Sequence, residues 1–167
     1  MATQTRSIYL EFKNLAVQDE WSIEPKPLDN IELDCTLKGG VRLVIGGKEV
    51  PIRGLWGPGD VDIEFWLMEF TSLQYYFDNG DRFYSIDLRN AGMPNFEFKR
   101  YGEEVMLQFT DQDTGEHVSA RFYYPDLEPV LDSVKSWLFE TLKQASPKKG
   151  ERFIRERLTP KRKGSLF

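Results

Sequence analysis

The second half of the chain contains four short apolar and aromatic runs, and the turns between them are too short for anything except antiparallel pairing. The runs are rich in residues that favour strands, and they lie at residues 83–88, 96–101, 105–109 and 118–124. Polar turns separate them at residues 92–94, 102–103 and 113–115. Parallel strands need long crossover connections. The spacing therefore predicts antiparallel β-structure.

The first half of the chain shows a similar but looser pattern. Apolar and polar residues alternate over residues 8–13 and 31–37, as in strands with one buried face. Gly39-Gly40 and Gly46-Gly47 flank another alternating stretch, and each pair is a two-residue turn signal. Consecutive hairpins are therefore expected here, with Pro51 at a sheet edge because proline cannot donate to a ladder.

A helix is predicted after each group of strands. The first is expected to begin at an Asp60 N-cap, with apolar residues at helical spacing from Ile63 to Phe77. Residues 61–65 also alternate, so a short strand there is an alternative. The second helix is expected to begin at an Asp126 cap and to end at Ser146-Pro147. Its apolar stripe contains Leu127, Val130, Leu131, Val134, Trp137, Leu138 and Leu142.

These elements predict an α+β fold. We expect a mainly antiparallel sheet of about seven or eight strands with two helices packed on one face. A single domain is expected over residues 1–146, followed by a tail over residues 147–167. Trp137 lies in the middle of the second helical stripe and is expected to anchor that helix to the sheet.

The tail carries the opposite charge from the domain. Eight basic and two acidic residues give residues 147–167 a net charge of +6. Residues 1–146 contain 14 basic and 25 acidic residues, a net charge of −11 within a total of −5. The candidate contact residues of the tail are Lys148, Lys149, Arg152, Arg155, Arg157, Lys161, Arg162 and Lys163. Such asymmetry indicates that the tail meets an anionic surface.

Three alternatives follow for the tail. It folds back onto the acidic domain, it binds an anionic partner such as a nucleic acid, or it is a disordered end. The domain's negative charge opposes nucleic-acid binding, and Phe153 and Phe167 are the tail's two aromatic residues available for base stacking. Docking or disorder is therefore favoured over a nucleic-acid contact.

The sequence contains one histidine and one cysteine, and neither lies in a catalytic motif. His117 follows a turn directly, a position where an exposed histidine is more common than a catalytic one. Cys35 lies between Asp34 and Thr36 on an alternating segment, where the nearby carboxylate disfavours a reactive thiolate. We expect both residues to be chemically idle and Cys35 to be buried.

Residues 113–115 resemble the Asp-Thr-Gly signature of retroviral-type aspartic proteases. In that family the triplet follows an apolar strand directly, whereas here Asp111-Gln112 precede it and Glu116-His117 follow it. Asp-Thr-Gly is also an ordinary hairpin sequence. An exposed turn is therefore expected. The same stretch lacks the ligand spacing of a calcium-binding EF-hand.

No metal or cofactor site is predicted. One histidine and one cysteine do not provide a zinc ligand set, and Gly46-Gly47-Lys48 lacks the spacing of a phosphate loop. A small hydrolase that uses only carboxylates stays an alternative. The spacing of the acidic residues singles out no pair for that role, so a non-catalytic function is favoured.

A small acidic domain without a catalytic motif is most simply a protein-binding module. In size and charge alone, it is similar to bacterial immunity proteins, which cover toxic and often basic enzymes with an acidic surface. The resemblance implies a basic protein partner in the cytoplasm of a bacterium, or a phage origin. An accessory protein that contacts nucleic acid through its tail is a further alternative. The single cysteine and the lack of an apolar leader or span favour a cytoplasmic location without membrane contact.

Overall fold

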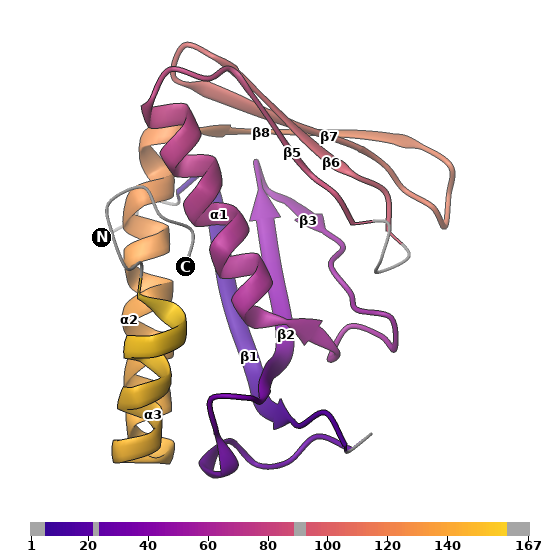
Figure 1. The fold of residues 1–167 in the computed structure, drawn as a ribbon. Helices are drawn as coiled ribbons and strands as arrows, with labels where there is room; N and C mark the ends of the chain where they lie inside the picture. The colour runs from indigo at the N-terminus through magenta and orange to yellow at the C-terminus, as the bar shows by residue number, and fades with distance from the viewer. Residues whose placement is uncertain (1–5, 22–23, 89–92, 160–167) are drawn as a thin grey trace, which may run out of the picture.

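The computed structural model describes residues 6–21, 24–88 and 93–159. Within these ranges, eight strands form two antiparallel sheets of four strands each, accompanied by three α-helices. The predicted α+β class and antiparallel pairing are confirmed. The strands are divided between two sheets instead of sharing one, and Figure 1 shows the second sheet running across one end of the first.

The first sheet has the order β1-β2-β3, and β4 also pairs with β2. Gly46 and Gly47 form the predicted turn between β2 and β3, with φ angles of +56° and +79° that favour glycine. The strands of this sheet are β1 (Ile8–Gln18), β2 (Thr36–Ile45), β3 (Lys48–Val50) and β4 (Val61–Asp62).

The predicted turn at Gly39-Gly40 is wrong, because both glycines lie inside β2. The β1–β2 register shifts between Lys13 and Ala16, where β1 bulges. A Cβ atom on Gly39 would lie 2.8 Å from the Lys13 carbonyl oxygen. Gly39 is therefore explained by the close approach of two backbones, a second role of glycine in strands. The strand expected over residues 31–37 begins at Thr36.

Helix α1 (Ile63–Asp78) has Asp62 as its N-cap residue instead of the expected Asp60. The Asp62 carboxylate accepts a hydrogen bond of 3.1 Å from the Phe65 N–H, which satisfies one of the free donors at the helix start. The short strand and the helix that the sequence offered as alternatives both exist here, in succession. Asp60 lies two residues upstream and has a different role, described below.

The second sheet contains its strands in chain order, which are β5 (Phe83–Ile86), β6 (Phe96–Tyr101), β7 (Glu104–Thr110) and β8 (His117–Tyr123). Alternate residues of these strands are buried and join the core, where the Phe96 ring lies 5.8 Å from the ring of Trp66 on α1. Helix α1 thus packs between the two sheets. The opposite side of the second sheet faces solvent.

The outer edge of β8 is hydrogen-bonded by Lys48 of the first sheet and by Ser7, the residue that precedes β1. Lys48 Nζ donates a 2.8 Å hydrogen bond to the Ser119 carbonyl oxygen. The Tyr123 N–H donates to Ser7 Oγ at 2.7 Å, and Ser7 Oγ donates to the Asp126 carboxylate at 2.6 Å. These contacts tie the two sheets together and occupy backbone groups that an edge strand would otherwise expose.

Helix α2 (Leu127–Ala145) begins and ends where the sequence predicts, but the expected Asp126 cap is wrong, because its carboxylate makes no capping bond and accepts hydrogen bonds from Ser7 instead. Its buried residues are Leu127, Val130, Leu131, Val134, Leu138 and Leu142. The expectation that Trp137 is an anchor is wrong, because its side chain is 44% exposed. Trp137 lies roughly 100° around the helix from Leu138, at the margin of the stripe, where a large ring is left in water.

The described part of the tail is helical and packs on the domain. Helix α3 (Pro147–Phe153) lies beside α2, as Figure 1 shows, and continues into a π-helical turn, η4 (Ile154–Leu158). Phe153, Ile154 and Leu158 are buried in the common core. Gly150 allows the close contact, because a Cβ atom there would lie 2.1 Å from the Leu142 carbonyl oxygen. Residues 147–158 of the tail therefore fold back onto the domain, which is one of the three alternatives considered for the tail. A domain boundary at residue 146 stays a prediction.

Candidate functional site

A tight turn between β3 and β4 exposes two large apolar side chains. Leu55 is 68% exposed and Trp56 is 88% exposed. The backbones of Gly54 and Gly57 exchange two hydrogen bonds across them, at 3.0 and 3.4 Å. We call residues 54–57 the Trp56 tip. An exposed tryptophan at the end of a hydrogen-bonded turn is a surface feature that the apolar core does not require.

Asp60 holds the Trp56 tip in place. Its carboxylate accepts a 3.3 Å hydrogen bond from the Trp56 N–H and lies 3.4 Å from Lys38 Nζ on β2. Its backbone packs so closely on Gly54 that a Cβ atom there would lie 1.7 Å from the Asp60 carbonyl oxygen. The position therefore requires glycine, and the tip is fixed to the first sheet.

A hollow of about 340 Å³ lies beside the Trp56 tip. Phe65 and Trp66 of α1 supply part of its apolar wall. Its charged lining consists of three carboxylates and two cations, namely Asp60, Asp62, Asp87, Lys38 and Arg53. The tip is therefore an apolar projection beside a hollow whose lining carries one more negative than positive charge.

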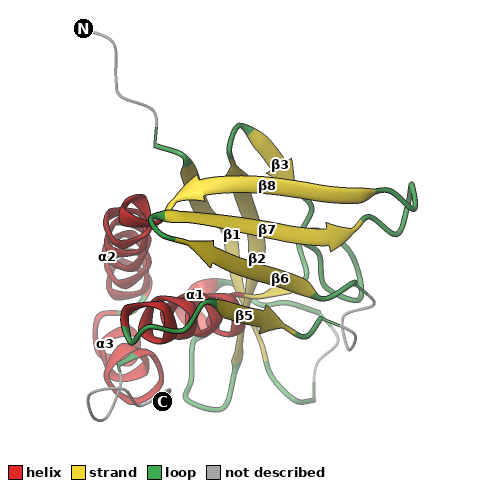
Figure 2. Ribbon diagram, turned by 90° about the horizontal axis from the view of Figure 1, so that it is seen from above, coloured by secondary structure: helices red, strands yellow, loops and turns green. Residues whose placement is uncertain are grey.

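The second candidate surface is the solvent-facing side of the second sheet, which we call the open face. Its aromatic members are Phe83, Tyr101 and Tyr123, all exposed. The strand register places Phe83, Lys99, Met106 and Arg121 in one row across the four strands. Among the described residues, no helix packs over this side, and Figure 2 shows the sheet uncovered from above.

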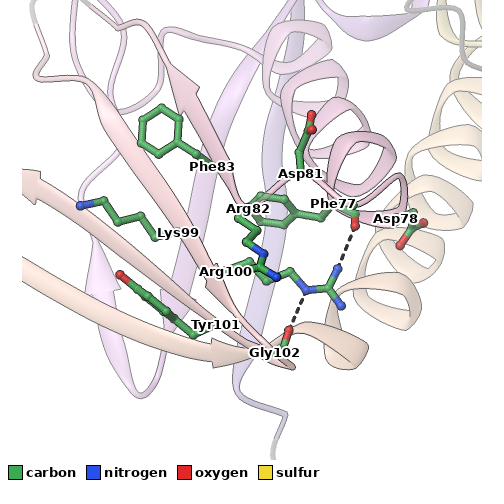
Figure 3. Close-up of a pocket in the computed structure, with 10 residues that line it drawn as sticks. Phe77, Asp78, Asp81, Arg82, Phe83, Lys99, Arg100, Tyr101 and Gly102 are labelled. Atoms are coloured by element: carbon green, nitrogen blue, oxygen red, sulfur yellow. Dashed lines mark hydrogen bonds between the residues drawn. The ribbon is translucent and has the colours of Figure 1, made fainter.

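At one border of the open face lies a wide hollow of about 790 Å³, where α1 ends and β5 and β6 meet. Figure 3 shows Phe83, Lys99 and Tyr101 directed away from α1, whereas Arg100 reaches toward it. Arg100 donates to the carbonyl oxygens of Phe77 and Gly102, at 2.9 and 2.7 Å. Arg100 thereby completes the carboxyl end of α1.

Tyr124 lies against Arg100 but does not line the hollow; its ring centre is 4.1 Å from the guanidinium carbon. The Tyr124 hydroxyl donates its single proton to the Asp78 carboxylate at 2.6 Å, and the Gln74 carbonyl oxygen lies 3.0 Å from the same hydroxyl. Burial, together with the bond to Asp78, raises the pKa of Tyr124 well above its usual value. The phenol therefore stays protonated and acts as a structural donor.

The tail cations do not form one binding set. Arg157 donates to the Glu64 carboxylate and to the carbonyl oxygens of Leu33 and Cys35. Lys149 lies 2.6 Å from Glu32, a bond that raises the pKa of Lys149, and Arg155 lies 3.5 Å from Glu156. The two cations of the described tail without such a partner are Lys148 and Arg152, both exposed on α3. Lys161, Arg162 and Lys163 lie outside the described residues.

The structure separates the candidate reactive residues. His117 is exposed, with Nδ1 3.1 Å from Thr110 Oγ1, whereas Cys35 is buried as predicted, 4.0 Å from the Asn30 carbonyl oxygen. Asp113 lies in the exposed turn between β7 and β8. Over the part of the chain that the structure describes, no three side chains of His, Cys, Asp or Glu are grouped to hold a metal ion.

Comparison with known proteins gives no further guidance. No protein-family model, curated protein or solved structure matches this chain. In the described ranges, no helix combines the length and apolar character needed to cross a lipid bilayer. The surfaces described above are therefore the basis for a functional assignment.

Sequence reasoning identified neither surface. Nothing in the sequence distinguishes an exposed Leu55-Trp56 pair from one that is folded under. A signal for the open face does exist, because Phe83, Tyr101 and Tyr123 each lie an odd number of residues from the buried members of their strands, in the phase that faces solvent.

Proposed function

We propose that this chain is a non-catalytic protein-binding module that covers a basic protein, in the manner of an immunity-type inhibitor of a toxin or enzyme. The setting is the cytoplasm of a bacterium or a phage-infected cell. The observation that carries the proposal is the Trp56 tip. Leu55 and Trp56 project from a turn that two glycines and Asp60 hold in one conformation.

Such a tip suits protein recognition for an energetic reason. Tryptophan is enriched among the few interface residues that contribute most to affinity. A projecting residue whose backbone is already ordered loses little conformational entropy on binding. The hydrogen bonds between Gly54 and Gly57 and the contact with Asp60 provide that order. The tip thus has the properties of an anchor that enters an apolar pocket.

The charge around the tip favours a basic partner. Carboxylates outnumber cations in the adjacent hollow, and residues 1–146 carry a net charge of −11. A field of this sign accelerates the approach of a cationic protein and disfavours acidic ones. An apolar pocket with a cationic rim is therefore the complementary surface expected on the partner.

The test is affinity capture from a lysate of the producing cells, with the full chain immobilised. Wild type, Trp56→Ala and Trp137→Ala are compared at low salt and at about 0.5 M salt, where the Debye length falls well below 10 Å. We expect one basic protein in stoichiometric amount, with weaker retention at high salt. Trp56→Ala should weaken its binding by about 30-fold or more, as for a hot-spot residue.

Trp137→Ala is the matched control, because it removes an exposed tryptophan from α2 and leaves the tip intact. It should bind like wild type. The proposal fails if wild type retains no protein at either salt concentration. It also fails if the captured protein is equally well retained by Trp56→Ala.

A further inference from the structure

A second exposed tryptophan, Trp21, lies in the turn that follows β1. Trp21 is 92% exposed, and together with Trp56 it is the most exposed large apolar side chain among the described residues. The Trp21 N–H donates a 3.1 Å hydrogen bond to the Asp19 carboxylate. The other carboxylate oxygen of Asp19 lies 2.6 Å from Lys26 Nζ. The backbone that carries Trp21 is therefore held by a carboxylate that a lysine holds in turn.

The same arrangement fixes the Trp56 tip. One carboxylate oxygen of Asp60 accepts the bond from the Trp56 N–H, and the other lies 3.4 Å from Lys38 Nζ. At both places, a paired aspartate orders the backbone beneath an exposed tryptophan. Such order lowers the conformational entropy that binding costs. Trp21 thus has the property that makes Trp56 suitable as an anchor.

Trp21 also lies close to the hollow beside the Trp56 tip. Gln18, the last residue of β1, lines that hollow together with Lys38 of β2. Trp21 follows Gln18 by three residues, so their Cα atoms lie within about 11 Å of each other. Figure 1 shows the residues that follow β1 and the loop between β3 and β4 toward the same end of the first sheet. A partner that covers the tip and its hollow is therefore within reach of Trp21.

The charge around Trp21 has the same sign as the charge around the tip. Residues 18–26 contain three acids and one lysine. Glu20, which directly precedes Trp21, is exposed. A cationic protein surface is attracted to such a segment, and an anionic one is repelled. The chemistry of the partner that fits Trp21 is therefore that of the partner proposed for Trp56.

We infer that Trp21 is a second anchor for the same basic protein, which presents one apolar pocket to each tryptophan. This inference rests on the proposed function, because it assigns a further contact to the partner proposed there. Binding free energy is commonly concentrated in a few aromatic side chains, and weaker contacts around them exclude water. Trp21 and Trp56 are the two such side chains at this end of the sheet.

The test uses the basic protein that the immobilised full chain captures, after purification of that protein. Its Kd is measured for wild type, Trp21→Ala, Trp56→Ala and the variant with both changes. We expect Trp21→Ala to weaken binding by at least about tenfold, and the double variant to bind more weakly than either single variant. Alanine keeps the N–H that Asp19 binds, so the turn itself is retained.

Trp137→Ala is the matched control, because it removes another exposed tryptophan from α2. It should bind like wild type. A second measurement shows whether the contact is direct. In a chain labelled with fluorinated tryptophan, the fluorine resonances of Trp21 and Trp56 should shift when the partner is added, and that of Trp137 should not.

The outcomes separate this inference from the proposal on which it rests. If wild type captures no basic protein, the proposed function fails and the second anchor falls with it. If Trp56→Ala weakens binding while Trp21→Ala binds like wild type, the second anchor alone is overturned. A Trp21 resonance that the partner leaves unchanged, or an equal loss of affinity in Trp137→Ala, also overturns it.

Discussion

The guanidinium group of Arg157 donates two hydrogen bonds to the carboxylate of Glu64, at 3.1 and 2.9 Å, although 93 residues separate them in sequence. Arg157 also donates to the carbonyl oxygens of Leu33 and Cys35, and it lies over the Phe153 ring, 4.9 Å from the ring centre. One side chain therefore joins the tail to α1 and to the segment before β2. The basic tail is held by specific hydrogen bonds in addition to its overall charge.

Arg157→Ala should lower the free energy of unfolding by about 2–3 kcal/mol, because it leaves the half-buried Glu64 carboxylate and two carbonyl groups without their donor. Urea denaturation of the full chain measures this loss. Arg155→Ala removes an exposed cation that lies 3.5 Å from Glu156. This change should cost less than about 0.5 kcal/mol of unfolding free energy. Equal losses in the two variants would contradict the assigned role of Arg157.

Phe153→Ala should cost about 3–5 kcal/mol, the usual range for deleting a fully buried phenylalanine side chain. A domain over residues 1–146 followed by a separate tail, as the sequence predicts, would stay folded without residues 148–167. The burial of Phe153 and Leu158 instead leads us to expect that deleting residues 148–167 lowers stability. Thermal unfolding of Phe153→Ala and of the truncated chain measures both effects. A truncated chain as stable as wild type would show that the tail is separate from the folded domain, as the sequence predicts.

Leu138→Ala should destabilise the fold by about 2–5 kcal/mol, whereas Trp137→Ala should cost less than about 1 kcal/mol. The two neighbours differ because Leu138 is fully buried and Trp137 is 44% exposed. Chemical denaturation of both variants makes the comparison. If Trp137→Ala proved the more damaging change, the orientation of α2 described here would be incorrect.

Glu69 should make the stability of the fold depend on pH. Burial raises the pKa of Glu69 above its usual 4.5, while Tyr84 donates it a 2.5 Å hydrogen bond. The folded chain therefore binds this proton more readily than the unfolded chain. The free energy of unfolding falls as pH rises from the unfolded-state pKa through the raised folded-state pKa, and this contribution is constant at higher pH. Glu69→Gln keeps an acceptor for Tyr84 but does not titrate.

Urea denaturation of wild type and Glu69→Gln at about pH 4 and about pH 7 tests this expectation. The variant should gain stability relative to wild type at the higher pH, and the difference should shrink at the lower pH. A difference that stays constant between the two conditions would show that Glu69 contributes no pH dependence.

The fold class was predictable because strand and helix periods are local properties of the sequence. Alternation at residues 8–13 and the spacing of apolar residues from Ile63 to Phe77 each correspond to an element of the structure. The division into two sheets was not predictable, because it depends on which strands meet after folding. Gly39 illustrates the difficulty, since the same residue type serves a turn or a close backbone approach.

The candidate surfaces were less accessible to sequence reasoning. Charge identified the tail as a contact segment, but it did not reveal that Arg157 is used within the chain. The exposure of Trp56 depends on backbone hydrogen bonds across Gly54 and Gly57, which no short-range pattern specifies. Helical spacing placed Trp137 among the buried residues, because a position at the margin of an apolar stripe satisfies the same count.

The bonds from Ser7 to Tyr123 and Asp126 also constrain when the fold can form. The Ser7 N–H donates to an Asp126 carboxylate oxygen 119 residues later. A ribosome adds about 5–20 residues each second, so on the order of ten seconds passes between the synthesis of the two. During that interval the apolar side chains of β1 are not yet covered by α2, the helix that packs on this strand in the folded chain; they belong to Ile8, Leu10 and Phe12. The growing chain therefore stays exposed to wrong associations until α2 has left the ribosome.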